Sequence, residues 1–210
     1  MADSSWSSWA EGYLRAYWRQ AIESALSNAI SARWHPNGFM VFRLDEVSEG
    51  DLRGSRRVHI WPGGVERKEM PGHPTIHSHD WELQSLVLTG RYSDVIFKTS
   101  TDAPTLVTHA VKYDAAAGDS IEPTGGGIRL VQHEVREVNA GDCHHMDVGV
   151  PHETLVPMNE TVVTHVMMGP RHVDGMMLAG EAAFTAKSFS RPALSDLEQD
   201  YARTTLSALL

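Results

Sequence analysis

The stretch from residue 39 to residue 168 contains many short apolar runs, and this pattern constrains the fold more than any other feature. Runs rich in Val, Ile, Leu, Phe and Thr alternate with clusters of Gly, Pro and Asp. Such runs, separated by frequent turn signals, are typical of antiparallel sandwiches and barrels. We therefore expect an all-β core with strands near residues 39–46, 56–62, 75–79, 83–89, 92–99, 106–113, 128–138, 143–148, 152–157 and 161–168.

Helices are expected on both sides of this β region. Apolar residues from Trp9 to Trp34 approximate helical spacing, and the sequence HPNG that follows disfavours continuation. Ser195 and Glu198 have capping-box spacing and predict a helix from about residue 196 to 208. Residues 114–127, which include three consecutive glycines, are expected to form a mobile loop, and residues 171–194 to be irregular.

Length and composition favour one soluble globular domain. The 210 residues carry a formal net charge of −9 and a single cysteine, Cys143, so no disulfide can form within the chain. We expect an N-terminal helical segment (1–38), a barrel (39–170) and a C-terminal extension with a helix (171–210). The lone thiol and the missing secretion signal predict a cytoplasmic protein. No apolar run reaches the roughly 18 residues of a membrane helix, and the negative charge disfavours nucleic-acid binding. Exposed helices and edge strands favour a homodimer.

Two segments concentrate the histidines in a pattern that indicates a metal site. In the first, His77 and His79 lie two residues apart on an expected strand, so both imidazoles project to one side. In the second, the turn Gly149-Val150-Pro151 precedes His152, which opens a later strand. The alternative is that these are solvated strand and turn histidines without a ligand.

These segments resemble the two motifs of the cupin superfamily. The first motif is a glycine, His-x-His, usually a glutamate, and a closing glycine, and residues 72–90 (GHPTIHSHDWELQSLVLTG) follow it; residues 141–153 (GDCHHMDVGVPHE) follow the second. The resemblance implies a double-stranded β-helix, or jelly-roll, barrel in which His77, His79 and His152 bind a metal ion. The family's glutamate position holds Leu83 here. Glu82 and Gln84 would point to the opposite face of a regular strand, unless a bulge brings one of them back.

A three-histidine cupin with a helical N-terminus looks like the cysteine dioxygenase group of thiol dioxygenases. Residues 58–64 (VHIWPGG) and 164–170 (THVMMGP) are similar to that group's strands. The resemblance implies Fe(II), with O2 and substrate at the open positions, although the group's substrate-binding arginine and catalytic tyrosine have no aligned position here. Imidazole ligands alone also suit Ni, Cu or Zn, and Mn is a further possibility.

The resulting functional hypothesis is a mononuclear non-heme Fe(II) oxygenase that acts on a small polar molecule, such as a thiol or an amino acid. One alternative is an isomerase, lyase or hydrolase that uses the ion as a Lewis acid. Another is a barrel that binds a small molecule without turnover. The three-histidine count and the missing glutamate favour the oxygenase.

Other polar residues are candidates for supporting roles. Arg57 shares a strand face with His59 and Trp61, so it is a clamp for a substrate carboxylate if that face is interior, and a surface arginine otherwise. His165 is a catalytic candidate that holds a ligand or substrate by a hydrogen bond, or else a core histidine. His73 lies in a Gly/Pro loop. His144 and its neighbour His145 must point to opposite faces if their segment is a strand.

Overall fold

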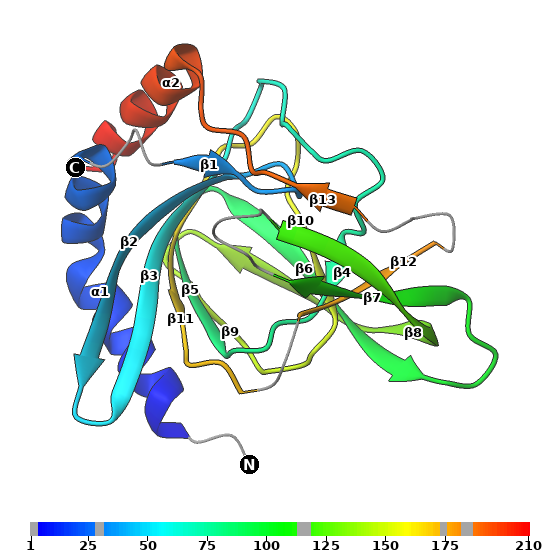
Figure 1. The fold of residues 1–210 in the computed structure, drawn as a ribbon. Coiled ribbons are helices and arrows are strands. Elements are labelled where there is room, and N and C mark those ends of the chain that lie inside the picture. Colours follow the sequence, from blue (N-terminus) through cyan, green and yellow to red (C-terminus); the bar gives the residue numbers. More distant parts are fainter. Residues whose placement is uncertain (1–3, 28–31, 113–118, 173–175, 182–186) are drawn as a thin grey trace.

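The computed structural model describes residues 4–27, 32–112, 119–172, 176–181 and 187–210. Helices flank a twisted β body (Figure 1). In chain order, the elements are α1 (Ser4–Ser27), β1 (Arg33–Trp34), β2 (Met40–Glu49), β3 (Leu52–Trp61), β4 (Ile76–His77), β5 (Leu83–Thr89), β6 (Arg91–Ser100), β7 (Leu106–Lys112), β8 (Asp119–Asn139), β9 (Cys143–Met146), β10 (His152–Leu155), β11 (Val162–Met168), β12 (Met176–Gly180), β13 (Lys187–Phe189) and α2 (Asp196–Ser207).

The strands form two antiparallel sheets with jelly-roll topology. The first sheet has the order β1-β2-β3-β11-β5-β9 and the second the order β13-β8-β6-β10-β4-β12-β7. Strands β3, β4, β5 and β6 alternate between the sheets along the chain, and β8, β9, β10 and β11 alternate again. Two such sets of four, closed face to face, make a double-stranded β-helix. The predicted all-β, cupin-type core with terminal helices is therefore confirmed.

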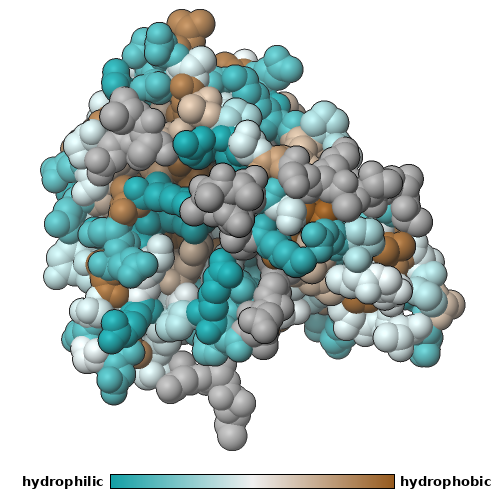
Figure 2. All heavy atoms as spheres, viewed as in Figure 1, coloured by the Kyte–Doolittle hydropathy of each residue, from teal (hydrophilic) through white to brown (hydrophobic). Residues whose placement is uncertain are grey.

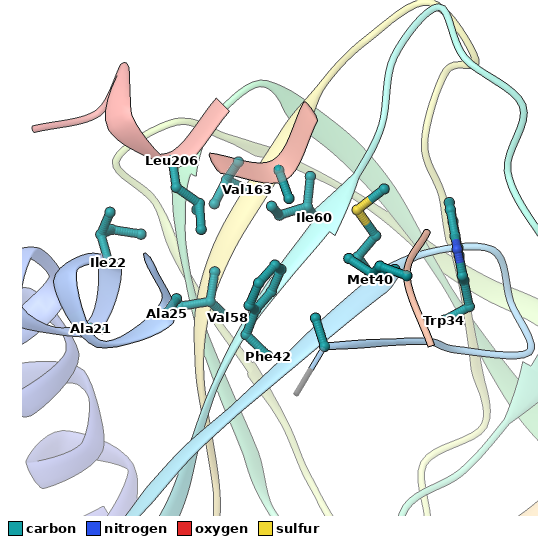
Figure 3. Packing of buried hydrophobic residues seen from close by; sticks show 13 residues of the cluster. Ala21, Ile22, Ala25, Trp34, Met40, Phe42, Val58, Ile60, Val163 and Leu206 are labelled. Atoms are coloured by element: carbon teal, nitrogen blue, oxygen red, sulfur yellow. The ribbon is translucent and has the colours of Figure 1, made fainter. Parts of the chain in front are cut away.

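The main apolar core lies outside the barrel, between the first sheet and the two helices. Figure 3 shows Ile22 of α1 and Leu206 of α2 in one cluster with Phe42, Val58 and Ile60 of β2 and β3. Because strand side chains alternate, Met40 and Phe42 of β2 and Val58 and Ile60 of β3 reach this layer. Burying each such side chain contributes roughly 1.5–3 kcal/mol. This layer holds the first sheet in place.

The helix predicted for residues 9–34 is wrong at both ends. Helix α1 begins at Ser4 and ends at Ser27, and Trp34 lies in β1, where it pairs with Met40 of β2. The HPNG sequence forms the turn of this β hairpin: the His35 N–H donates to Phe39 O at 2.7 Å, and Gly38 has φ +78°. Trp34 is buried in the core, but as a strand residue rather than as part of the helix.

The C-terminal helix is confirmed. Helix α2 spans Asp196–Ser207, and the Ser195 N–H donates to Glu198 Oε2 at 2.7 Å, as the capping-box spacing predicts.

Two regions expected to be irregular contribute strands instead. Of the predicted loop, residues 114–118 lie outside the described residues, but residues 119–127 belong to β8, in which residues 120–123 and 127 pair with β7. A Cβ on Gly127 would lie 2.8 Å from Pro104 Cβ, so this glycine permits close packing rather than mobility. Between residues 171 and 194, β12 pairs with β4 and β7, and β13 with β8. In both regions, pairing with strands distant in the sequence makes these residues part of the sheet.

The face drawn in Figure 2 is mostly hydrophilic, with hydrophobic side chains in small separate areas. Within the described residues, neither helix is long and apolar enough to cross a membrane.

Candidate metal centre

Three histidines, two in neighbouring strands and one just after a strand, converge inside the barrel. His77 of β4 and His152 of β10 are direct cross-strand partners. His79 follows two residues after β4, where its carbonyl accepts the Gly149 N–H at 2.9 Å. The three rings have centroid separations of 4.4–5.0 Å, and one potential ligand atom from each lies within 4.8 Å of the others. Among the described residues, no other group of His, Cys, Asp and Glu has this geometry.

The hydrogen bonds of these rings orient them for metal binding. His77 Nδ1 lies 2.9 Å from Thr75 O, and His152 Nδ1 lies 3.1 Å from Val150 O. Since a carbonyl can only accept, Nδ1 carries the proton in both rings and Nε2 presents a lone pair. The His79 ring stacks on the Trp81 ring, with centroids 5.2 Å apart. The buried Nδ1 of His79 has no hydrogen-bond partner among the described residues.

Burial keeps all three imidazoles neutral. It lowers the pKa of His77 to about 3, with a further contribution from the nearby His152. Burial and the proximity of His77 lower the pKa of His79 well below 6.5, and burial also lowers the pKa of His152. The neutral ring is the form that binds a metal ion. Donor type, tautomer and charge of this cluster therefore fit a divalent cation.

The three rings open into a cavity of about 890 Å³ inside the barrel. Leu83 and Ser85 of β5 line it, whereas Glu82 and Gln84 do not. Gln84 Oε1 instead accepts a hydrogen bond from Ser7 Oγ at 3.1 Å on the opposite face. No bulge brings either residue to the cluster, so the described residues supply three imidazoles and no carboxylate.

The face of β3 that carries Arg57, His59 and Trp61 is interior, and all three residues line the cavity. Arg57 is therefore placed where its guanidinium can meet a bound molecule. Burial, followed by the charge of Arg57, lowers the pKa of His59 to about 3, so this ring also stays neutral.

His165 is not brought to the three-histidine cluster. It lies on the face of β11 opposite to Val166, which lines the cavity. His165 is fully buried beneath α1, with Nδ1 3.4 Å from Leu14 O. This is the position of a core histidine, and we do not include it in the site. His73 lies against Phe189, with ring centroids 6.4 Å apart, and is not part of the cavity wall.

The structure adds a buried pair that the sequence reasoning missed. His144 of β9 points into the cavity, where its Nε2 lies 2.9 Å from Asp94 Oδ2; Asp94 Oδ1 accepts from Thr154 Oγ1 at 3.0 Å. His145 points outward, so the two neighbours face opposite sides, as expected for a strand. Asp94 lacks a local sequence signal, because it is a single carboxylate among the mixed polar and apolar residues of β6.

The turn before β9 sets which of the two histidines faces inward. Gly141 has φ +92°, and its N–H donates to Val87 O at 2.8 Å. Asp142 Oδ2 accepts the Asn139 N–H at 2.9 Å. This turn fixes the pairing of His144 with Ser85 of β5.

Comparisons with known proteins add no family assignment. No protein-family model and no curated protein matches the sequence. Among solved structures, similar chains include DMSP lyase DddQ from Ruegeria pomeroyi DSS-3 (15% identity, TM-score 0.35, covering 72% of this chain and 51% of that chain). Others are the cysteine peptidase Peruvianin-I from Thevetia peruviana latex (13%, 0.36, 70% and 71%) and a cupin-like protein from Thermotoga maritima MSB8 (11%, 0.35, 81% and 91%).

This chain thus spans about half the length of the DMSP lyase chain. With TM-scores of 0.35–0.36, these likenesses carry no argument about activity. The cupin-like fold stands on the strand topology, and the possible metal site on the three-histidine geometry.

Proposed function

We propose that the protein is a mononuclear non-heme Fe(II) oxygenase that acts on a small polar molecule. The observation that carries this proposal is a cluster of three neutral imidazoles at the wall of a large cavity. Among the described residues, no carboxylate belongs to this cluster. A closed structural metal site usually has four protein ligands. Three ligands leave positions for outside molecules, and neutral ligands leave the full charge of the cation to attract them.

In this proposal, each group of residues has a separate role. His77, His79 and His152 would hold the ion, and the carbonyls of Thr75 and Val150 keep two of these rings in the required tautomer. When bound, Fe(II) supplies the means to activate O2 beside the substrate. Arg57 would orient a substrate carboxylate, since a guanidinium binds carboxylates in a bidentate manner. Because residues 58–64 and 164–170 resemble the cysteine dioxygenase group, we propose small thiols as the first candidate substrates to test.

A second candidate is a lyase or hydrolase in which the ion acts as a Lewis acid. The observation that favours it is the Asp94–His144 pair on the cavity wall, because such chemistry needs a proton acceptor near the substrate. This candidate predicts activity without O2 and with Zn(II).

Metal analysis followed by anaerobic reconstitution tests these proposals. Protein purified without chelators or nickel affinity is expected to contain about one ion per chain, which is the stoichiometry of a single mononuclear site. After loading with Fe(II), we expect O2 consumption with at least one member of a panel of thiols, amino acids and aromatic compounds.

Three other outcomes are informative. Turnover by the Zn(II) protein without O2 would replace the oxygenase with the second candidate. Metal uptake without any turnover would contradict both enzyme proposals. Metal content far below one per chain, with stabilisation by small molecules, would indicate a binding module.

A further inference from the structure

Two adjacent histidines of β9 each contact an aspartate, but in opposite environments. The His144–Asp94 pair lies in the barrel at 2.9 Å, with side chains only 8% and 2% exposed. The His145–Asp147 pair lies on the outer face at 3.1 Å, with side chains 27% and 57% exposed. A hydrogen bond to a carboxylate is much stronger away from water, so only the inner pair has a fixed arrangement.

The hydrogen bonds of Asp94 define the state of the His144 ring. Burial alone raises the pKa of Asp94, but other interactions, of which the hydrogen bond from His144 is the largest, hold that pKa below its ordinary value. The carboxylate is thus ionised and can only accept, so His144 Nε2 carries the proton. The lone pair of this ring is then on Nδ1. A ring oriented by a carboxylate in this way is the usual arrangement of a general base.

The surroundings of His144 also point to proton exchange with a ligand. Asp94 is the cross-strand partner of Thr154, two residues beyond His152 on β10, so the pair lies beside the three-histidine cluster. The Tyr92 ring packs edge-on against the His144 ring, with centroids 6.2 Å apart. Burial raises the pKa of Tyr92, so its phenol stays protonated and does not compete as a base.

We propose that His144, positioned by Asp94, exchanges a proton with the molecule bound at the three-histidine cluster; this inference rests on the proposed metal site. A neutral acid R–X–H enters the cavity and binds as R–X⁻, while its proton moves to Nδ1 of His144. The imidazolium is stabilised by the ionised Asp94, and the proton returns when the ligand or product leaves as a neutral acid. No electrons are transferred in this step. The substrate class is therefore a molecule with a weakly acidic X–H group, such as a thiol or an alcohol.

The first test is the tautomer of His144 in the metal-free protein, measured by NMR after labelling the histidines with ¹⁵N. We expect a proton on Nε2, shifted far downfield by the Asp94 carboxylate and slow to exchange. Asp94→Asn should abolish this signal, and the matched surface substitution Asp147→Asn should leave it unchanged. A proton on Nδ1 of His144 in the unsubstituted protein would overturn the proposal, and this result does not depend on whether a variant folds.

The second test counts protons during ligand binding to the Co(II)-loaded protein, with 2-mercaptoethanol as the probe. Titration calorimetry at pH 7.5 in two buffers of different ionisation enthalpy gives the number of protons released per thiol bound. A free thiol is protonated at this pH. We expect almost no release from the unsubstituted protein or from His145→Gln, and about one proton from His144→Gln, because its amide is not a base.

Equal proton counts in the unsubstituted protein and His144→Gln, or the absence of thiol binding by the metal-loaded protein, would contradict the proposal. A chain that takes up no Co(II) would count against the proposed metal site instead. The NMR measurement still decides the Asp94–His144 arrangement in that case.

Discussion

The two faces of the first sheet differ in what they bury. Its outer face packs against α1 and α2 through apolar side chains such as Val58, Ile60 and Val163. Its inner face presents Arg57, His59 and Ser85 to the cavity. Because side chains alternate along a strand, one stretch of β3 supplies both the core and the cavity wall. One side of this sheet therefore carries the large core shared with the helices, and the other combines smaller apolar clusters with the polar cavity wall.

The largest expected effect concerns metal binding, which should depend on side chains that face the barrel interior from β4 and β10 of the second sheet, and not on the outer face of the first sheet. His77→Ala removes a ligand, so we expect bound metal to fall from about one ion per chain to none, with the thermal midpoint of the metal-free protein nearly unchanged. His165→Gln, on the outer face of β11, should retain the ion. Metal analysis by mass spectrometry and thermal unfolding measure both. Equal loss of metal from the two variants would contradict the prediction that metal binding depends only on side chains that face the interior.

Stability should depend on the outer face. Phe42→Ala is expected to lower the free energy of unfolding by about 3–5 kcal/mol, since it leaves a void beneath the helices. Leu83→Ala, at the cavity wall, should cost only about 1–2 kcal/mol, because much of this side chain already faces an open space. Urea unfolding at pH 7.5 compares the two. Equal losses would show that the cavity side contributes as much packing as the helical side.

The smallest expected effect is the pH dependence of stability, which both faces should share. Burial lowers the pKa of His59 on the inner face to about 3 and that of His165 on the outer face to about 4, from 6.5 in the unfolded chain. The unfolded state therefore binds more protons, and the stability present above pH 6.5 is lost as the pH falls towards these values. Each histidine should contribute a slope of about 1.4 kcal/mol per pH unit below 6.5.

His59→Gln and His165→Gln should each reduce that slope by one proton. The free energy of unfolding, measured in urea at intervals from pH 7 to pH 5, gives the slope. An unchanged slope in either variant would mean that its ring is protonated in the folded protein.

The parts of the molecule that were predictable are those with local signals. Short apolar runs between turn signals predicted the strands, and the spacing of His77 and His79 together with the turn before His152 predicted the cluster. Strand parity predicted that Gln84 points away from the cavity and that His144 and His145 face opposite sides. Even so, β4 ends at His77, so His79 reaches the cluster from an irregular segment rather than from the expected strand.

What could not be predicted depends on contacts between distant segments. The glycines 125–127 indicated a loop, but they belong to β8, in which Gly127 pairs with Val107 of β7. Trp34 continued a helical spacing by coincidence, because its partner is Met40 across a hairpin. Asp94 and His144 are 50 residues apart, and only closure of the barrel brings them together. Neither residue is distinctive within its own strand.

The turn around Gly141 has a consequence for how this barrel tolerates change. Because β9 carries His144 and His145 side by side, shifting the strand by a single position would exchange their faces. An insertion or deletion of one residue between Asn139 and Cys143 would send the ring now beside Asp94 to the surface and turn its neighbour inward. The length of this short connection, more than the identity of either side chain, determines which histidine faces the interior.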